Sequence, residues 1–163
     1  EILGGGSVLS SRLGKKIRGE MGLVYDVGSW FQTGHAAGPW MASLGTNPKN
    51  AAKAKAQLKA VVEKMRREGP SAEEVAESRR FITGVLSLRL STNAGIASFL
   101  LNAENYGLGL DYLSRFRQLY GSVTQKQVQA AAGKYLHPES AVLIGAGGQD
   151  SAGNGRDAGK GKN

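Results

Sequence analysis

Two strand-like stretches near the start of this 163-residue chain are followed by a long series of helical stretches. Residues 23–33 are rich in β-branched and aromatic side chains, residues 39–44 carry the apolar Trp40, Met41 and Leu44, and turn residues lie between the two stretches. From residue 48 onward, apolar side chains recur at spacings near 3.6, as on one face of a helix. A hairpin followed by a run of helices predicts an α+β domain, with an antiparallel sheet and helices packed on one face.

Local start and stop signals give the expected bounds of the later elements. We expect helices at 48–68, 72–90, 94–106, 110–120 and 125–136, and a short apolar strand at 141–146. Asn47 is placed to cap the first helix, and Thr124 the last. Ser71 and Glu74 have the spacing of a capping box at the start of the second helix.

The composition favours one globular domain with a polar tail. We expect the domain to span residues 1–147, and residues 148–163 to be disordered because they carry no large apolar side chain. No apolar run approaches the length of about 18 residues that spans a bilayer. The first residues, Glu1 to Leu3, look like the approach to a helix, so we interpret the chain as a fragment.

The net charge of +8 is spread along helices rather than gathered in one block. We interpret the cations between Lys49 and Arg67 as a solvated helix face. Without a zinc-finger pattern or an aromatic RNA-binding box, a nucleic-acid-binding protein is the weakest of the three interpretations considered, and we expect no nucleic-acid partner. The absence of Cys excludes disulfides and thiolate metal ligands.

The N-terminal segment carries the most specific pattern in the chain. The run Leu-Gly-Gly-Gly at 3–6 precedes an expected basic amphipathic helix at 7–20, which Gly22 ends. A Gly-Leu-x-Tyr turn then enters the first strand. Arg18 at the end of the helix and Tyr25 on the strand stand seven residues apart across that turn.

This combination resembles the second, non-zinc half of the M16 zinc metallopeptidases, the insulinase, pitrilysin and mitochondrial processing peptidase family. The resemblance covers about residues 2–147 and implies an α+β domain, here with its first strand missing. It also implies that Arg18 and Tyr25 reach toward a zinc site on the other half, as catalytic residues. Gly4, Gly5 and Gly6 would border the chamber and bind substrate. The family adds its peptide substrate to a sheet edge as a strand, near residues 24–31.

General chemistry agrees with these two roles. A Tyr hydroxyl can donate a hydrogen bond to the oxyanion that develops at a scissile carbonyl. An Arg guanidinium can hold a neighbouring carbonyl of the peptide and fix its register. Taken without their context, the same residues would be an ordinary Arg at a helix end and an ordinary strand Tyr.

A zinc site of this family requires the pattern H-x-x-E-H, which the sequence lacks. His35 and His137 are far apart and have no suitably spaced partner, so we expect surface histidines and no metal site in this chain. The resemblance implies that zinc is bound by a partner domain or subunit, upstream in the same chain or separate, and that this chain is inactive alone. The alternative is a non-catalytic M16-fold scaffold subunit.

Overall fold

The computed structural model describes residues 1–6 and 10–147. One antiparallel hairpin is followed by helices, which confirms the α+β prediction. The elements in chain order are the π-helix η1 (Gly14–Glu20), β1 (Val24–Phe31), β2 (Trp40–Thr46), the 3₁₀ turn η2 (Pro48–Asn50), α1 (Ala51–Glu68), α2 (Ala72–Arg89), α3 (Asn93–Asn105), α4 (Tyr112–Gly121) and α5 (Gln125–Tyr135). The expected tail at 148–163 lies outside the described residues.

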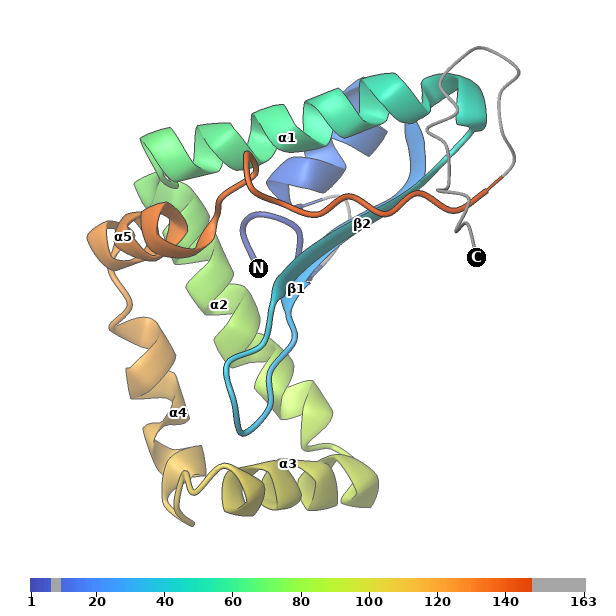
Figure 1. The fold of residues 1–163 in the computed structure, drawn as a ribbon. Coiled ribbons are helices and arrows are strands. Elements are labelled where there is room, and N and C mark those ends of the chain that lie inside the picture. The colour runs from blue at the N-terminus through green and yellow to red at the C-terminus, as the bar shows by residue number, and fades with distance from the viewer. Residues whose placement is uncertain (7–9, 148–163) are drawn as a thin grey trace, which may run out of the picture.

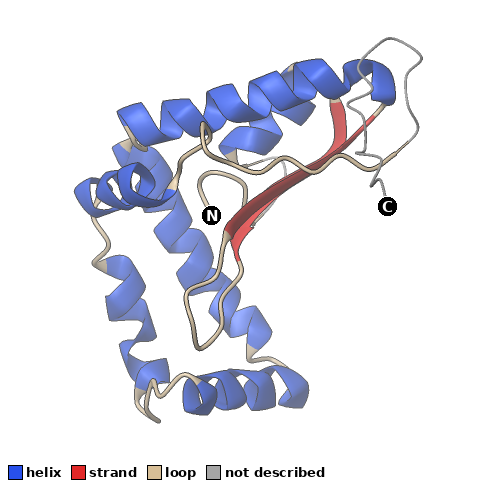
Figure 2. Cartoon of the chain, viewed as in Figure 1, coloured by secondary structure: helices blue, strands red, loops and turns tan. Residues whose placement is uncertain are grey.

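The helices form two groups around the hairpin. Figure 1 shows α1 crossing above the hairpin with η1 beneath it, while α2, α3 and α4 make three sides of an open frame. α5 packs on α1, and α4 packs on α2. The colouring by secondary structure in Figure 2 shows that the sheet is confined to this one hairpin among the described residues.

One extra residue interrupts the hairpin near its start. The register pairs Val24 with Thr46 and then Asp26 with Gly45, so the intervening Tyr25 is a β-bulge. Because of the bulge, Val24 and Val27 are both buried although they are three residues apart. The bulge therefore sends Tyr25 and Asp26 outward together.

The core lies between the inner face of the hairpin and the helices η1, α1 and α5. Its centre contains Leu13 and Ile17 from η1 and the turn before it, together with Val62 from α1, and all three are fully buried. Around them lie the other members of the cluster: Leu3, Leu23, Val24, Val27, Ala54, Met65, Ala132 and Leu136. Apolar burial of this kind provides the main driving force for folding.

The predicted caps are present. Asn47 accepts a hydrogen bond from the Lys49 N–H at 3.0 Å. Ser71 and Glu74 form the full capping box, in which the Ser71 hydroxyl accepts from the Glu74 N–H and the Glu74 carboxylate accepts from the Ser71 N–H. Thr124 caps α5 with a second capping box. The Ser71 and Thr124 caps explain why α2 and α5 begin at the predicted residues, 72 and 125. Asn47 caps the turn η2, and α1 itself begins at Ala51, three residues after the predicted start.

Two predicted elements were wrong in part. The helix expected at 7–20 is helical only from Arg12 in the described residues, and from Gly14 it is a π-helix; residues 7–9 lie outside the description. Residues 141–146 form no strand in the part of the chain described, and the apolar side chains of Val142 and Ile144 are 89% and 87% exposed. A strand needs a neighbour that accepts its backbone hydrogen bonds, and this segment has none there.

The outer edge of β2 is also unpaired. In an antiparallel pair, opposite residues alternate between pairs that hydrogen-bond to each other and pairs whose backbone groups point away from each other. Gln32 donates its N–H to the Pro39 carbonyl at 3.0 Å, so these two residues form a hydrogen-bonded pair. Counting along the register from there, the backbone N–H and C=O groups of Ala42 and Leu44 point away from β1. Among the described residues these outward groups have no hydrogen-bond partner.

Taken singly, no helix in the described ranges has the length and apolarity of a membrane span; α2 and α3 meet that criterion only as a pair bent by 118°.

Candidate functional site

Arg18 lies in the last turn of η1 with its side chain exposed. Its carbonyl accepts the Gly22 N–H at 3.1 Å, which closes the end of the helix. Within the described ranges, the guanidinium makes no hydrogen bond or ion pair. A charged group held at a helix end without a partner in its own domain is available to a ligand.

Tyr25 occupies the bulge at the start of β1, and its side chain is 70% exposed. The hydroxyl has no hydrogen-bond partner in the part of the chain that the structure describes. A regular strand would alternate inward and outward positions, and the inserted residue breaks that alternation at this side chain.

Two backbone irregularities therefore stand on either side of one tight turn. Gly22 adopts a φ of +59°, a conformation that L side chains rarely adopt, and the Leu23 N–H returns to the Ile17 carbonyl at 3.0 Å. A π-helix precedes the turn and a bulge follows it. Both irregularities are found preferentially at functional sites, where they redirect side chains. Each one here contains one of the two predicted residues, Arg18 and Tyr25.

The glycines of the N-terminal loop have a packing role. The Gly4 carbonyl accepts the outward N–H of Ser29 at 2.9 Å, and a Cβ on Gly4 would lie 2.6 Å from the Ser29 Oγ. Gly6 has a φ of +61° and Gly5 lies against the backbone of Glu1. The loop can approach β1 this closely only with glycine at position 4. The predicted substrate contacts of Gly4, Gly5 and Gly6 stay a prediction.

An ion pair that the sequence did not reveal holds the same region in place. Arg12 donates from Nε and Nη2 to the two carboxylate oxygens of Glu74, and from Nη2 to the Gly69 carbonyl at 2.9 Å. The bond with Arg12 is the main reason that the pKa of Glu74 is lowered from its ordinary value. These two residues lie 62 positions apart. Only the fold brings them together, and no local pattern could have identified the pair.

The histidines do not approach each other or an acidic cluster. The His35 ring lies 5.9 Å from the ring of Tyr106, centroid to centroid. His137 contacts the Glu139 carboxylate at 3.3 Å and the Lys134 carbonyl at 3.0 Å. No group of three or more His, Cys, Asp or Glu in the described ranges is arranged to hold a metal ion.

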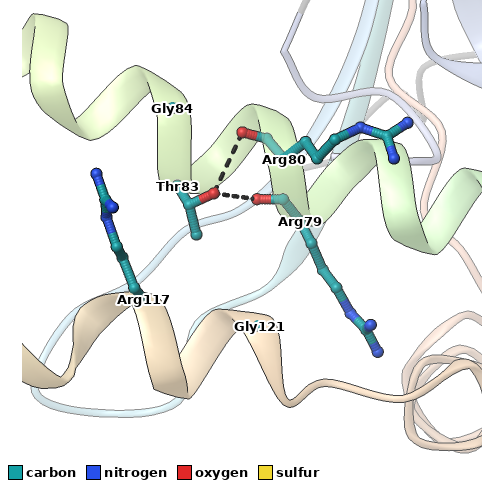
Figure 3. A pocket seen from close by; sticks show the side chains of 6 residues that line it. All are labelled: Arg79, Arg80, Thr83, Gly84, Arg117 and Gly121. Carbon is teal, nitrogen blue, oxygen red and sulfur yellow. Dashed lines mark hydrogen bonds between the residues drawn. The ribbon is translucent and has the colours of Figure 1, made fainter.

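A second feature is an open cavity of about 410 Å³ between α2 and α4. It is lined by Arg79, Arg80, Thr83, Gly84, Arg117 and Gly121 (Figure 3). Figure 3 shows the three guanidinium groups pointing in different directions, and Arg79 is already engaged by the Val123 carbonyl at 2.8 Å. Binding of a small anion requires donors that converge on it, so this cavity is the weaker candidate.

Comparison with known families matches the segment that contains both irregularities. Residues 1–81 match the family described as the peptidase M16 inactive domain. The chain belongs to the peptidase M16 inactive-domain family. The M16 resemblance inferred from residues 3–6, Arg18 and Tyr25 is thereby confirmed. No curated protein sequence matches the chain.

Two solved structures share this M16 fold. A peptidase M16 inactive domain from Pseudomonas fluorescens is 31% identical, with a TM-score of 0.75, over 84% of this chain and 32% of that one. A protease from Helicobacter pylori is 17% identical, with a TM-score of 0.74, over 84% of this chain and 33% of that one, and it shows the fold alone. The chain thus spans about a third of the length of these relatives.

Proposed function

We propose that this M16 domain is the non-zinc half of a zinc metalloendopeptidase and supplies Arg18 and Tyr25 to the hydrolysis of a peptide bond. The observation that carries the proposal is the placement of these two exposed side chains, which have no partner among residues 1–6 and 10–147, at a π-helix and a β-bulge on either side of the Gly22 turn. Zinc, bound by a partner M16 half, would polarise the scissile carbonyl and activate water.

Tyr25 acts on the transition state. As the scissile carbonyl becomes tetrahedral, negative charge builds on its oxygen, and the Tyr25 hydroxyl donates a hydrogen bond to it. That bond is strongest when the charge is fully developed, so it contributes more to catalysis than to substrate binding. The Tyr25 hydroxyl is exposed and bonds to no residue in the described ranges, which supports this role because no bond to those residues has to break first.

Arg18 positions the substrate. Its guanidinium presents several donors in one plane, which suits a carbonyl of an extended peptide beside the scissile bond. The substrate strand would lie beside the beginning of β1, because farther along that strand the outward N–H of Ser29 is taken by Gly4. Gly4, Gly5 and Gly6 would then border the peptide from the side of the N-terminal loop.

The test is kinetic and uses the assembly with the zinc-bearing half. Tyr25→Phe removes one hydroxyl and is expected to lower kcat about 10²–10³-fold, with a smaller change in KM. Tyr106→Phe, another exposed tyrosine, is the matched control and should leave both constants unchanged. Arg18→Ala should impair both KM and kcat, whereas Arg117→Ala should affect neither.

Two outcomes would overturn the proposal. If Tyr25→Phe keeps more than about half of the wild-type kcat, the hydroxyl does not stabilise the oxyanion. If no zinc-bearing partner yields activity while the chain assembles stably into a complex, the non-catalytic scaffold becomes the better description. The chain alone is expected to cleave no peptide.

A further inference from the structure

The two halves of α1 differ in how their positive charges are neutralised. Every cation in the second half has a carboxylate within 4 Å: Lys64 and Arg67 pair with Glu68, and Arg66 pairs with Glu63 and Glu139. The first half and the preceding turn η2 carry a lysine face, which we define as Lys49 in η2 and Lys53, Lys55 and Lys59 in α1. All four side chains are exposed, and none forms an ion pair with a described residue.

The sequence offers Lys49, Lys53 and Lys55 no acidic residue within four positions, and Lys59 has only Glu63, which pairs with Arg66. No Asp or Glu occurs between Pro48 and Val62, and the first turns of η2 and α1 contain no acidic residue. The N-terminus of a helix carries a partial positive charge, so cations there are unfavourable and acidic residues are preferred. Lys49 and Lys53, in η2 and the first turn of α1, are thus placed where neutral or acidic side chains would be more favourable.

A charge that is locally unfavourable and is not neutralised by a described residue of the same domain indicates a role in binding another molecule. We propose that the lysine face is a docking surface for an acidic polypeptide segment, whose carboxylates neutralise Lys49, Lys53, Lys55 and Lys59. The inference is independent of the peptidase role. It concerns the solvent side of α1 and requires no residue of the candidate site.

The chemistry of the face favours carboxylates over other anions. It contains only lysines, and it lacks the planar guanidinium forks that favour phosphate groups and the aromatic rings that stack on bases. The exposed residues between the lysines are small, namely Ala51, Ala52, Ala56 and Ala60. With no large apolar side chain to insert, the face is poorly suited to hold a membrane surface.

Exposed ammonium groups bind by many weak contacts. Each pair with a carboxylate is worth little on its own, so affinity comes from the sum over the face and falls as salt screens it. Such surfaces act mainly by raising the rate of encounter with an oppositely charged partner. A broad acidic segment is accordingly a better match than a single bound ion.

The experiment measures binding of a fluorescein-labelled peptide of alternating Glu and Gly to the full chain, at low salt, by fluorescence anisotropy. We expect Lys53→Ala/Lys59→Ala to weaken this binding by about threefold to tenfold. The control Arg80→Ala/Arg117→Ala removes the same charge from two exposed arginines on α2 and α4 and should change it less than about twofold. Alanine is the best helix former, so both variants should fold, which circular dichroism will verify.

The remaining binding measurements test whether the partner is an acidic polypeptide or another kind of anion. A Lys/Gly peptide of the same length should not bind, and added salt should abolish binding of the Glu/Gly peptide. Equal losses in both double variants would mean that only net charge matters, and would overturn the proposal. Tighter binding of a short DNA duplex or of phosphatidylglycerol vesicles that depends on Lys53 and Lys59 would also overturn it.

Discussion

Arg12 and Glu74 form a two-pronged ion pair, with Nε to Oε1 at 2.6 Å and Nη2 to Oε2 at 2.7 Å, which ties the start of the first helix to the N-terminus of α2. The two side chains are 20% and 27% exposed. Glu74 also serves in the capping box of α2, so one carboxylate stabilises both a helix start and a contact between distant segments.

Arg12→Lys should destabilise the domain although it conserves the charge. Lysine cannot bond both oxygens of Glu74 and the Gly69 carbonyl together, so we expect a loss of about 1–3 kcal/mol in the free energy of unfolding. Denaturant titration measures the loss. The control is Lys16→Ala, which removes an exposed pair with Glu20 of the same 2.6 Å length and should cost less than about 0.5 kcal/mol. Equal effects would show that the partly buried Arg12–Glu74 pair is no more important for stability than the exposed Lys16–Glu20 pair.

Acid should weaken this contact in a defined direction. The folded pKa of Glu74 lies below its ordinary value of 4.5. The contribution of its charge is therefore complete above pH 4.5 and is lost as the pH falls through the folded pKa. The stability difference between the wild type and Glu74→Gln should be constant near neutral pH and shrink in acid. A difference that grows on acidification would contradict this assignment.

Gly4→Ala should be destabilising because its Cβ has no space. The added atom would lie 2.7 Å from the Ser29 nitrogen and 2.8 Å from a Leu13 methyl, and we expect a cost of about 1–3 kcal/mol. Gly133 on α5 provides the contrast, since a Cβ there meets nothing within 4 Å. Gly133→Ala should stabilise the chain by about 0.5–1 kcal/mol through helix propensity. Thermal unfolding of the two variants should therefore shift in opposite directions.

Arg18→Ala and Tyr25→Phe should leave the isolated chain as stable as the wild type. Both side chains are exposed and make no described hydrogen bond or ion pair, so each change should stay within about 0.5 kcal/mol. Unfolding in urea tests this. A loss well above that limit would assign a structural role to the residue, and any kinetic defect would then need a different explanation.

Lys53→Glu should raise the stability of the domain while it damages the lysine face. Lys53 is the third residue of α1, where a carboxylate interacts favourably with the helix N-terminus, and we expect a gain of about 0.5 kcal/mol. The same change at Lys64, in the last turns beside Glu68, should be destabilising. If both changes move the melting temperature in the same direction, the helix dipole does not explain the difference.

Local chemistry predicted most of the fold. The capping box at Ser71 and the caps at Asn47 and Thr124 act within three residues, so they could be recognised in the sequence, and they mark the starts of α2, η2 and α5. The strand predicted at 141–146 failed because strand formation depends on a partner elsewhere in space, and apolar composition says nothing about that partner.

The sequence motif proposed Arg18 and Tyr25 as site residues, which stays a prediction, and it did not reveal their local geometry. The motif identified Arg18 and Tyr25, but not the π-helix or the bulge, because each is a change in hydrogen-bond register that any of several sequences can adopt. The Arg12–Glu74 pair, by contrast, required the tertiary structure. Glu74 had the appearance of one more solvated helix carboxylate, and its partner lies in a different part of the chain.

The π-helix and the bulge both depend on the number of residues in this segment, and not only on which residues they are. In a regular helix or strand, counting residues along the chain gives the direction of each side chain, and each of these two features adds one to the count. Deleting Tyr25 would leave Val24 opposite Thr46 and Asp26 opposite Gly45, so the ladder would become regular and the side chains beyond it would keep their faces. The bulge therefore adds the exposed Tyr25 to the hairpin without disturbing its register, and a one-residue deletion there would remove this side chain while leaving the rest of the ladder in place.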